Sequence, residues 1–305
     1  MKFRQHFVLI FLPLLIFLTS ATTLSVAQTN EVVVNVAVLN EKGMPVNGLG
    51  FDDFQISVDK VPQKIVNFQK NGGPSSIGIV IDDSASMFKG AKLEKLRARL
   101  IDGFEEFVKV GNESNEYFTM LFNSKASRFD NWSKDPSVIS TALANTTSEG
   151  QTPLYDALSQ AIKKVSSGNH QQHVLIVITD GQDSTSKLSF NKLRDELKDS
   201  DVILYAVGVL SGSDAGSSLG MEGQGVLDEL TSMTGGRAYF PHQDRDKEYA
   251  SVVAAIGADL MSQYQLVFIP DPMRKKKEWH EIKTKVSVPA DLKKKIVVRA
   301  RQAFH

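Results

Sequence analysis

The sequence contains no cysteine in its 305 residues. This absence excludes disulfide bonds, a cysteine nucleophile, thiolate metal ligands and a lipid-modified cysteine anchor. An excess of basic charge is also missing, because 35 Lys and Arg residues balance 35 Asp and Glu residues. Proteins that bind nucleic acid usually carry such an excess, so no nucleic-acid partner is expected. The fold must be held together by its hydrophobic core, and the 42% share of hydrophobic residues is ordinary for a globular chain.

Long apolar runs are absent too, except near the N-terminus. Residues 1–27 begin with Lys2 and Arg4, continue with a twelve-residue apolar run from 7 to 18, and end in small residues up to Ala27. This pattern is typical of a secretory signal peptide that is cleaved after Ala27. A retained membrane anchor is the alternative, but a span needs about 20 apolar residues. We therefore expect an exported protein, periplasmic or extracellular, without a membrane span after cleavage.

The two ends of the remaining chain are rich in β-branched residues and turns. The N-terminal arm, residues 28–73, contains the strand-like runs EVVVNVAVLN, DFQISV and KIVNFQ. The C-terminal arm, residues 263–305, contains YQLVFIP, EWHEIKTKVSV and KKIVVRAR. Neither arm has enough strands to bury a sheet face comfortably alone. We expect the two arms to pair with each other into one small β-sandwich.

The middle of the chain, residues 76–262, alternates strands with helices. SIGIVID at 76–82 is a short continuous apolar run, as expected for a strand buried on both faces. Repeated β-α alternation predicts an α/β domain with a doubly wound, Rossmann-like, mostly parallel sheet and helices on both faces. This domain is inserted in the β-sandwich of the arms. Binding sites in such sheets lie beyond the carboxyl ends of the strands.

A carboxylate and two hydroxyls follow the first strand of this domain. Asp82 ends the apolar run, and Ser84 and Ser86 occupy the next alternate positions. In a tight loop this spacing can turn three oxygens toward one point. Oxygen ligands favour magnesium, calcium or manganese over zinc and copper. The same residues could instead form a turn in which Ser and Asp side chains bond to backbone amides.

Two further residues are expected at the same edge of the sheet. Thr152 precedes Pro153 at a predicted helix start, and Asp180 ends another apolar strand. Each has a structural alternative: Thr152 is a good N-cap before a proline, and Asp180 with Gly181 is an ordinary turn pair. Together with the first loop, however, they supply two carboxylates and three hydroxyls from loops at one sheet edge.

This set of residues resembles the metal-ion-dependent adhesion site of von Willebrand factor A-type domains. The resemblance covers about 76–257, including TGGRAYF at 234–240, and the flanks resemble a bacterial subgroup in which the domain sits between β-rich arms. It implies a bound Mg²⁺, or Mn²⁺ or Ca²⁺, and a protein partner that presents an Asp or Glu carboxylate to the ion. The metal ligands implied are Asp82, Ser84, Ser86, Thr152 and Asp180.

The sequence evidence for an enzyme is weaker than that for a binding module. Residues 216–220 match G-x-S-x-G, but a nucleophile elbow needs a strand before and a helix after the serine, and Ser218 is predicted to lie in a flexible Gly/Ser-rich loop. His170 and His173 lack the glutamate and the helix of zinc-protease motifs. A hydrolase using the hard cation would need a general base that the sequence does not identify. We predict a non-enzymatic, adhesion-type binding module; a cell-envelope assembly module in which the metal only rigidifies loops is the alternative.

Overall fold

The computed structural model describes residues 31–304, except 42, 71–72, 88–90, 126, 210–216, 243–246, 273–277 and 289–295. The predicted signal peptide, residues 1–27, lies outside the described residues. Among the helices of the described part, none is both long and apolar enough to cross a membrane.

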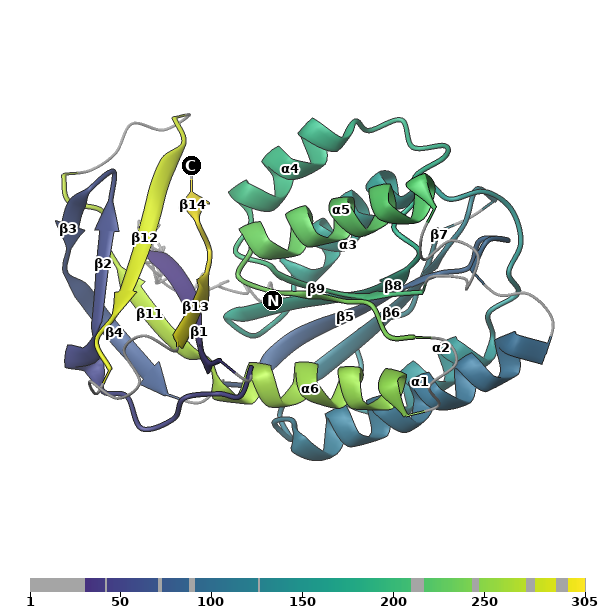
Figure 1. The fold of residues 1–305 in the computed structure, drawn as a ribbon, viewed down its shortest axis with the longest axis horizontal. Coiled ribbons are helices and arrows are strands. Elements are labelled where there is room, and N and C mark those ends of the chain that lie inside the picture. Colours follow the sequence, from purple (N-terminus) through teal and green to yellow (C-terminus); the bar gives the residue numbers. More distant parts are fainter. Residues whose placement is uncertain are drawn as a thin grey trace, which may run out of the picture. The chain divides into compact units, whose positions relative to one another are not determined.

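A six-stranded sheet forms the centre of the α/β domain, in the order β10-β9-β8-β5-β6-β7 (Figure 1). All its pairings are parallel except that of β7, which runs antiparallel at the edge. Every residue of β5 and β6 is buried, which explains their continuous apolar sequences. The prediction of a mostly parallel sheet is confirmed. The strands are β5 (Ser75–Asp82), β6 (Glu116–Phe122), β7 (Ser127–Phe129), β8 (Gln172–Thr179), β9 (Ile203–Gly208) and β10 (Ala238–Tyr239).

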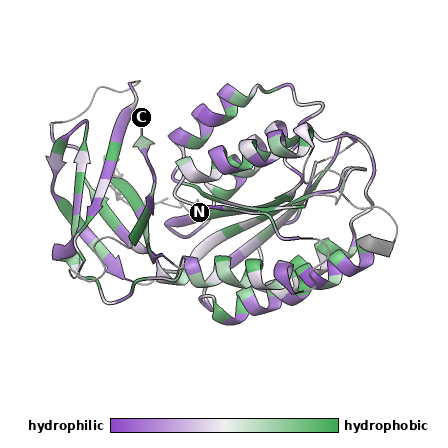
Figure 2. Cartoon of the chain, in the orientation of Figure 1, coloured by the Kyte–Doolittle hydropathy of each residue, from purple (hydrophilic) through white to green (hydrophobic). Residues whose placement is uncertain are grey.

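Helices cover both faces of this sheet. Alternate residues of β5 face opposite sides, so Ile77 and Ile79 join one core cluster while Val80 joins the other. The first cluster is covered by α1 (Ala91–Val110), α2 (Ser137–Ala144) and α6 (Glu248–Ser262). The second is covered by α3 (Leu154–Val165), α4 (Phe190–Asp199) and α5 (Ser218–Met233). Figure 2 shows the hydrophobic colour concentrated on the strands between the two helix layers.

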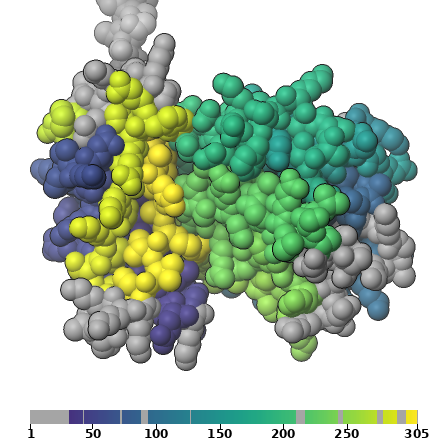
Figure 3. Space-filling model, turned by 45° about the horizontal axis from the view of Figure 1, so that its top comes forward, coloured from purple at the N-terminus to yellow at the C-terminus, as the bar shows by residue number. Residues whose placement is uncertain are grey.

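The two arms pair with each other in two antiparallel sheets, with strand orders β13-β1-β11-β4 and β14-β12-β2-β3. Each sheet contains strands from both arms, and their inner faces share one apolar core that includes Val36, Ile56 and Leu266. Figure 3 shows the N-terminal strands (purple and blue) and the C-terminal strands (yellow) side by side. The predicted sandwich is confirmed. The strands are β1 (Val32–Asn40), β2 (Phe54–Val58), β3 (Val61–Gln63), β4 (Ile65–Lys70), β11 (Tyr264–Phe268), β12 (His280–Val286), β13 (Ile296–Ala300) and β14 (Ala303–Phe304), with a short 3-10 turn at Phe51–Asp53.

One local prediction was wrong. Ser218 does not lie in a flexible loop but is the first residue of α5, and the hydroxyl oxygen of Ser217 caps this helix by accepting from the Gly220 amide at 3.1 Å. The helix that a nucleophile elbow requires after its serine is therefore present. The preceding strand β9, however, ends at Gly208 rather than at the serine.

Candidate metal and ligand-binding site

Asp82 lies at the carboxyl end of β5 and is fully buried. One carboxylate oxygen accepts from the Ser84 amide at 3.0 Å, and the other accepts from the Thr179 hydroxyl at 2.7 Å. Burial raises the pKa of Asp82 to about 7; these hydrogen bonds oppose the rise, and the negative charge of Asp180 adds to it. The two predicted carboxylates are thus close enough to interact.

The two serines of the first loop also meet. Their hydroxyl oxygens lie 3.1 Å apart, with Ser84 buried and Ser86 exposed. Neighbouring oxygen ligands of an octahedral Mg²⁺ lie about 2.9 Å apart, given metal–oxygen bonds of about 2.0–2.1 Å. The spacing of the two hydroxyls therefore fits adjacent positions around one hard cation, and Ser86 marks the side that faces solvent.

Asp180 reaches the same edge from the neighbouring strand. β5 and β8 are paired in parallel with Ile81 opposite Ile178, so the loops that follow the two strands leave the sheet side by side. Asp180 is 7% exposed, and one of its carboxylate oxygens accepts from the Gln182 amide at 3.0 Å. A Cβ on Gly181 would lie only 2.4 Å from the carbonyl oxygen of Gly223, so this loop rests directly on α5.

Thr152 is held between the other two loops through its main chain. Its amide donates to the Ser184 hydroxyl at 3.0 Å, and its carbonyl accepts from the Ser184 amide at 2.9 Å. On the other side, the carbonyl of Gly150 accepts from the Ala85 amide at 3.0 Å. α3 begins at Leu154 without a side-chain cap. The alternative interpretation of Thr152 as the N-cap is therefore wrong, and its hydroxyl is not used to cap the helix.

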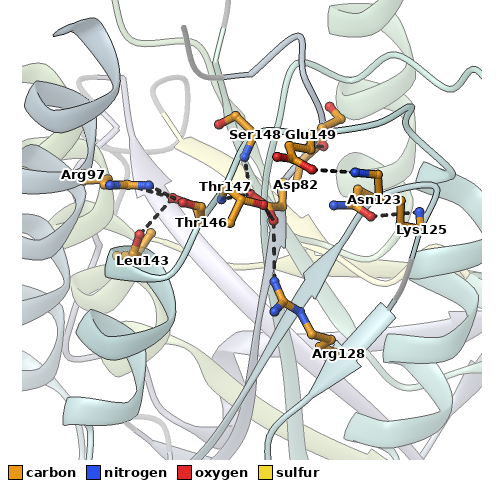
Figure 4. Close-up of polar contacts among 12 residues, drawn as sticks. Asp82, Arg97, Asn123, Lys125, Arg128, Leu143, Thr146, Thr147, Ser148 and Glu149 are labelled. Carbon is orange, nitrogen blue, oxygen red and sulfur yellow. Dashed lines mark hydrogen bonds and ion pairs between the residues drawn. The ribbon is translucent and has the colours of Figure 1, made fainter. Parts of the chain in front are cut away.

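Sequence reasoning missed one acidic residue of this region. Asp83 is fully buried beside Asp82 and accepts hydrogen bonds from the amide and hydroxyl of Thr147 and from the amide of Ser148. Ser148 and Arg128 both contact the carboxylate of Asp83. In Figure 4 these two residues approach from opposite sides, close to Asp82. Asp83 lies between the motif residues Asp82 and Ser84, at a position where the motif specifies no residue type. Only the pair of adjacent aspartates in the sequence could have indicated that Asp83 belongs to this region.

The donor set fits a hard divalent cation. Two carboxylates and three hydroxyls come from loops that hydrogen bonds join at one edge of the sheet. Within the described residues, no group of three or more His, Cys, Asp or Glu side chains is placed to bind a metal. The oxygen-only set that is present suits magnesium, manganese or calcium.

Comparison with known proteins identifies the α/β region. The family model of the von Willebrand factor type A domain matches residues 76–252, which is more than half of the chain. A search of the curated proteins finds no match.

Several solved structures are similar. A von Willebrand factor type A protein from Catenulispora acidiphila is 8% identical, with a TM-score of 0.48, over 90% of this chain and 74% of that one. The vWF domain of the type V pili tip protein Mfa5 from Porphyromonas gingivalis is 10% identical, with a TM-score of 0.47, over 62% and 97%. An aerotolerance-related membrane protein from Bacteroides fragilis is 15% identical, with a TM-score of 0.46, over 61% and 98%. At these identities the similarity extends no further than the fold.

Proposed function

Because the chain belongs to the von Willebrand factor type A domain family, whose members are typically interaction modules rather than enzymes, we propose that it is an exported, metal-dependent protein-binding module of the adhesion type. The observation that carries this proposal is the set of oxygen donors joined at the carboxyl edge of the sheet. The residues that would hold Mg²⁺, or Mn²⁺ or Ca²⁺, are Asp82, Ser84, Ser86, Thr152 and Asp180.

When bound, the cation supplies an open coordination position that suits an Asp or Glu carboxylate of a partner protein. The chain determines the direction from which that partner arrives. Asp82, Ser84 and Thr152 are at most 5% exposed, whereas Ser86 is open to solvent. The partner's acidic side chain therefore approaches across the first loop. Export to the periplasm or the cell exterior rests on the signal-peptide pattern of residues 1–27.

Thermal unfolding with Mg²⁺ and with chelator tests the metal dependence. A ligand at a hundred times its dissociation constant stabilises the fold by about 2.7 kcal/mol, which corresponds to a rise of several degrees in Tm. Thr152→Ala should abolish most of this rise, because it removes one proposed ligand. Thr141→Ala, at an exposed position on α2, should keep it. Identical melting curves for the wild type in Mg²⁺ and in chelator would contradict the proposal.

Partner capture separates adhesion from the alternative in which the metal only rigidifies loops. The purified protein is incubated with extract of the native cell envelope, with Mg²⁺ or with chelator, and bound proteins are compared. A partner that is lost both with chelator and with Thr152→Ala supports binding through the metal. A partner retained by the folded Thr152→Ala protein would instead support an assembly role for other surfaces.

A further inference from the structure

The carboxylate of Asp83 is fully buried, yet it is not one of the proposed metal ligands. It faces the segment 147–152, which carries Thr152 at its end. One carboxylate oxygen accepts from the amides of Thr147 and Ser148, the latter at 2.7 Å. The other accepts from the Thr147 hydroxyl at 2.9 Å. A buried charge needs such hydrogen bonds, and nearly all of those on Asp83 come from this segment.

The segment continues to Thr152 with a hydrogen bond at each residue. The Glu149 amide donates to the carbonyl of Asp83 at 2.9 Å, and the Gly150 carbonyl accepts from Ala85. The Gln151 amide then donates to the hydroxyl of Ser124 at 2.9 Å. Asp83 thus binds the first residues of the segment 147–152, and the last residue of that segment is the proposed ligand Thr152.

The shape of the segment explains why a strong acceptor is needed. Ser148 has φ of +55°, a left-handed conformation that is unfavourable for residues other than glycine. In this conformation its amide donates to the carboxylate of Asp83. Arg128, from β7, lies 3.7 Å from the same carboxylate and is 61% exposed, so it offsets the buried charge only weakly.

We infer that Asp83 is a positioning residue of the metal site: its carboxylate fixes the segment 147–152 and thereby holds Thr152 at the edge of the sheet where Asp82 and Asp180 emerge. This inference deepens the proposed function and rests on it for the role of the metal. The effect on the segment itself can be measured without any metal.

The test compares Asp83→Ala with Asp83→Asn. Asparagine keeps the oxygen that accepts from the two amides, whereas alanine removes both acceptors. Hydrogen exchange of the metal-free protein reports on the amides of 147–152, and calorimetric titration with MgCl₂ reports on affinity. We expect Asp83→Ala to speed exchange across the segment, including Thr152, and to weaken Mg²⁺ binding about tenfold, as losses of groups that orient metal ligands do. Asp83→Asn should stay near the wild type in both exchange rate and Mg²⁺ affinity.

Asp135→Ala, which removes an acceptor of the Ser137 amide at α2, is the matched control and should change neither the exchange of 147–152 nor the Mg²⁺ affinity. If the alanine variant does not fold, Asp83→Ser, too short to reach both amides, takes its place.

Each result decides one question. Unchanged exchange in Asp83→Ala overturns the inference. So does an Asp83→Asn protein that keeps its protected segment but binds Mg²⁺ as weakly as Asp83→Ala, because Asp83 would then act by charge. If the wild type binds no metal while only Asp83→Ala loosens Thr152, the proposed function fails and the positioning of the segment stands.

Discussion

At the scale of single residues, buried carboxylates are the most informative groups of this protein, and Glu116 shows how they link stability to pH. It is 4% exposed at the start of β6 and accepts from the Ser76 hydroxyl at 2.7 Å and from the amide and side chain of Asn169 at 2.6 and 2.8 Å. Burial alone would raise its pKa, but these hydrogen bonds, helped by the nearby His170, outweigh burial and hold the pKa below its ordinary value.

Because the folded-state pKa is lowered, the stability that Glu116 contributes is present above the unfolded-state pKa of about 4.3 and is lost as pH falls through the folded-state value. We expect Glu116→Gln to destabilise the protein by about 1–3 kcal/mol at pH 7 and to flatten the loss of stability below about pH 4.3. Urea unfolding between neutral and acidic pH measures both effects. Glu105→Gln, on an exposed part of α1, serves as control. An acid slope in Glu116→Gln equal to that of the wild type would refute this role.

Sequence reasoning located Asp82 and Asp180 because each ends an apolar strand, and a parallel sheet brings such ends together. It could not locate the partners of Asp83, which lie 64 and 65 positions further along the chain. Those contacts depend on how one irregular segment folds back over the first loop. No periodicity or spacing in the sequence encodes that path.

At the scale of elements, the packing of α1 against α6 depends on a glycine. A Cβ on Gly103 would lie 2.9 Å from both the Cα of Ala250 and the Cβ of Val253, closer than real contacts allow. A Cβ on Gly225, at an exposed position of α5, would meet nothing within 4 Å. Both glycines lie inside helices, so alanine improves helix propensity by about 1 kcal/mol at either position.

The two substitutions should therefore have opposite signs. Gly225→Ala is expected to raise the free energy of unfolding by up to about 1 kcal/mol. Gly103→Ala is expected to lower it by about 1 kcal/mol, because the cost of forcing the helices apart, about 1–3 kcal/mol, exceeds the gain in propensity. Chemical denaturation of the two variants beside the wild type gives the answer. Equal stabilisation by both would show that the helices separate freely.

The start of α5, which sequence reasoning missed, involves the same kind of close contact. The start of α5 is rich in Ser and Gly, which favours a loop, but Ser217 caps the helix and Gly220 and Gly223 are buried. A Cβ on Gly223 would lie 2.5 Å from the Asp180 carbonyl oxygen. Glycine is required here because the backbones of α5 and of the loop after β8 come into direct contact beside the site. This tertiary contact outweighs the low helix propensity of glycine. The short helix α2 and the edge strand β7 were likewise not predicted.

At the scale of the whole molecule, the arms are joined to the α/β domain by buried polar contacts. Arg299 on β13 donates to a carboxylate oxygen of Asp259 on α6 at 2.6 Å, and the other oxygen accepts from the hydroxyl of Tyr205 on β9. Asp259 is 4% exposed. In a second contact between the two parts, Arg301, which follows β13, donates to the carbonyl of Lys198 on α4 at 2.8 Å. The two parts therefore share charges that neither can leave unpaired at low cost.

This sharing predicts that the arms and the α/β domain unfold together. The chain has two tryptophans, Trp132 beside Phe118 of the central sheet and Trp279 next to β12 of the arms. In the Trp279→Phe protein, Trp132 reports on the α/β domain. In the Trp132→Phe protein, Trp279 reports on the arms where they meet α4, because its ring centre lies 5.1 Å from the Nζ of Lys198. We expect coincident denaturation curves. Arg299→Met strands the charge of Asp259 and should lower stability by about 3–5 kcal/mol. The double variant Arg299→Met, Asp259→Asn should recover part of that loss, since no buried charge remains unpaired. Two separate transitions in the otherwise wild-type proteins, or equal stability of the single and double variants, would mean that this ion pair does not couple the two parts.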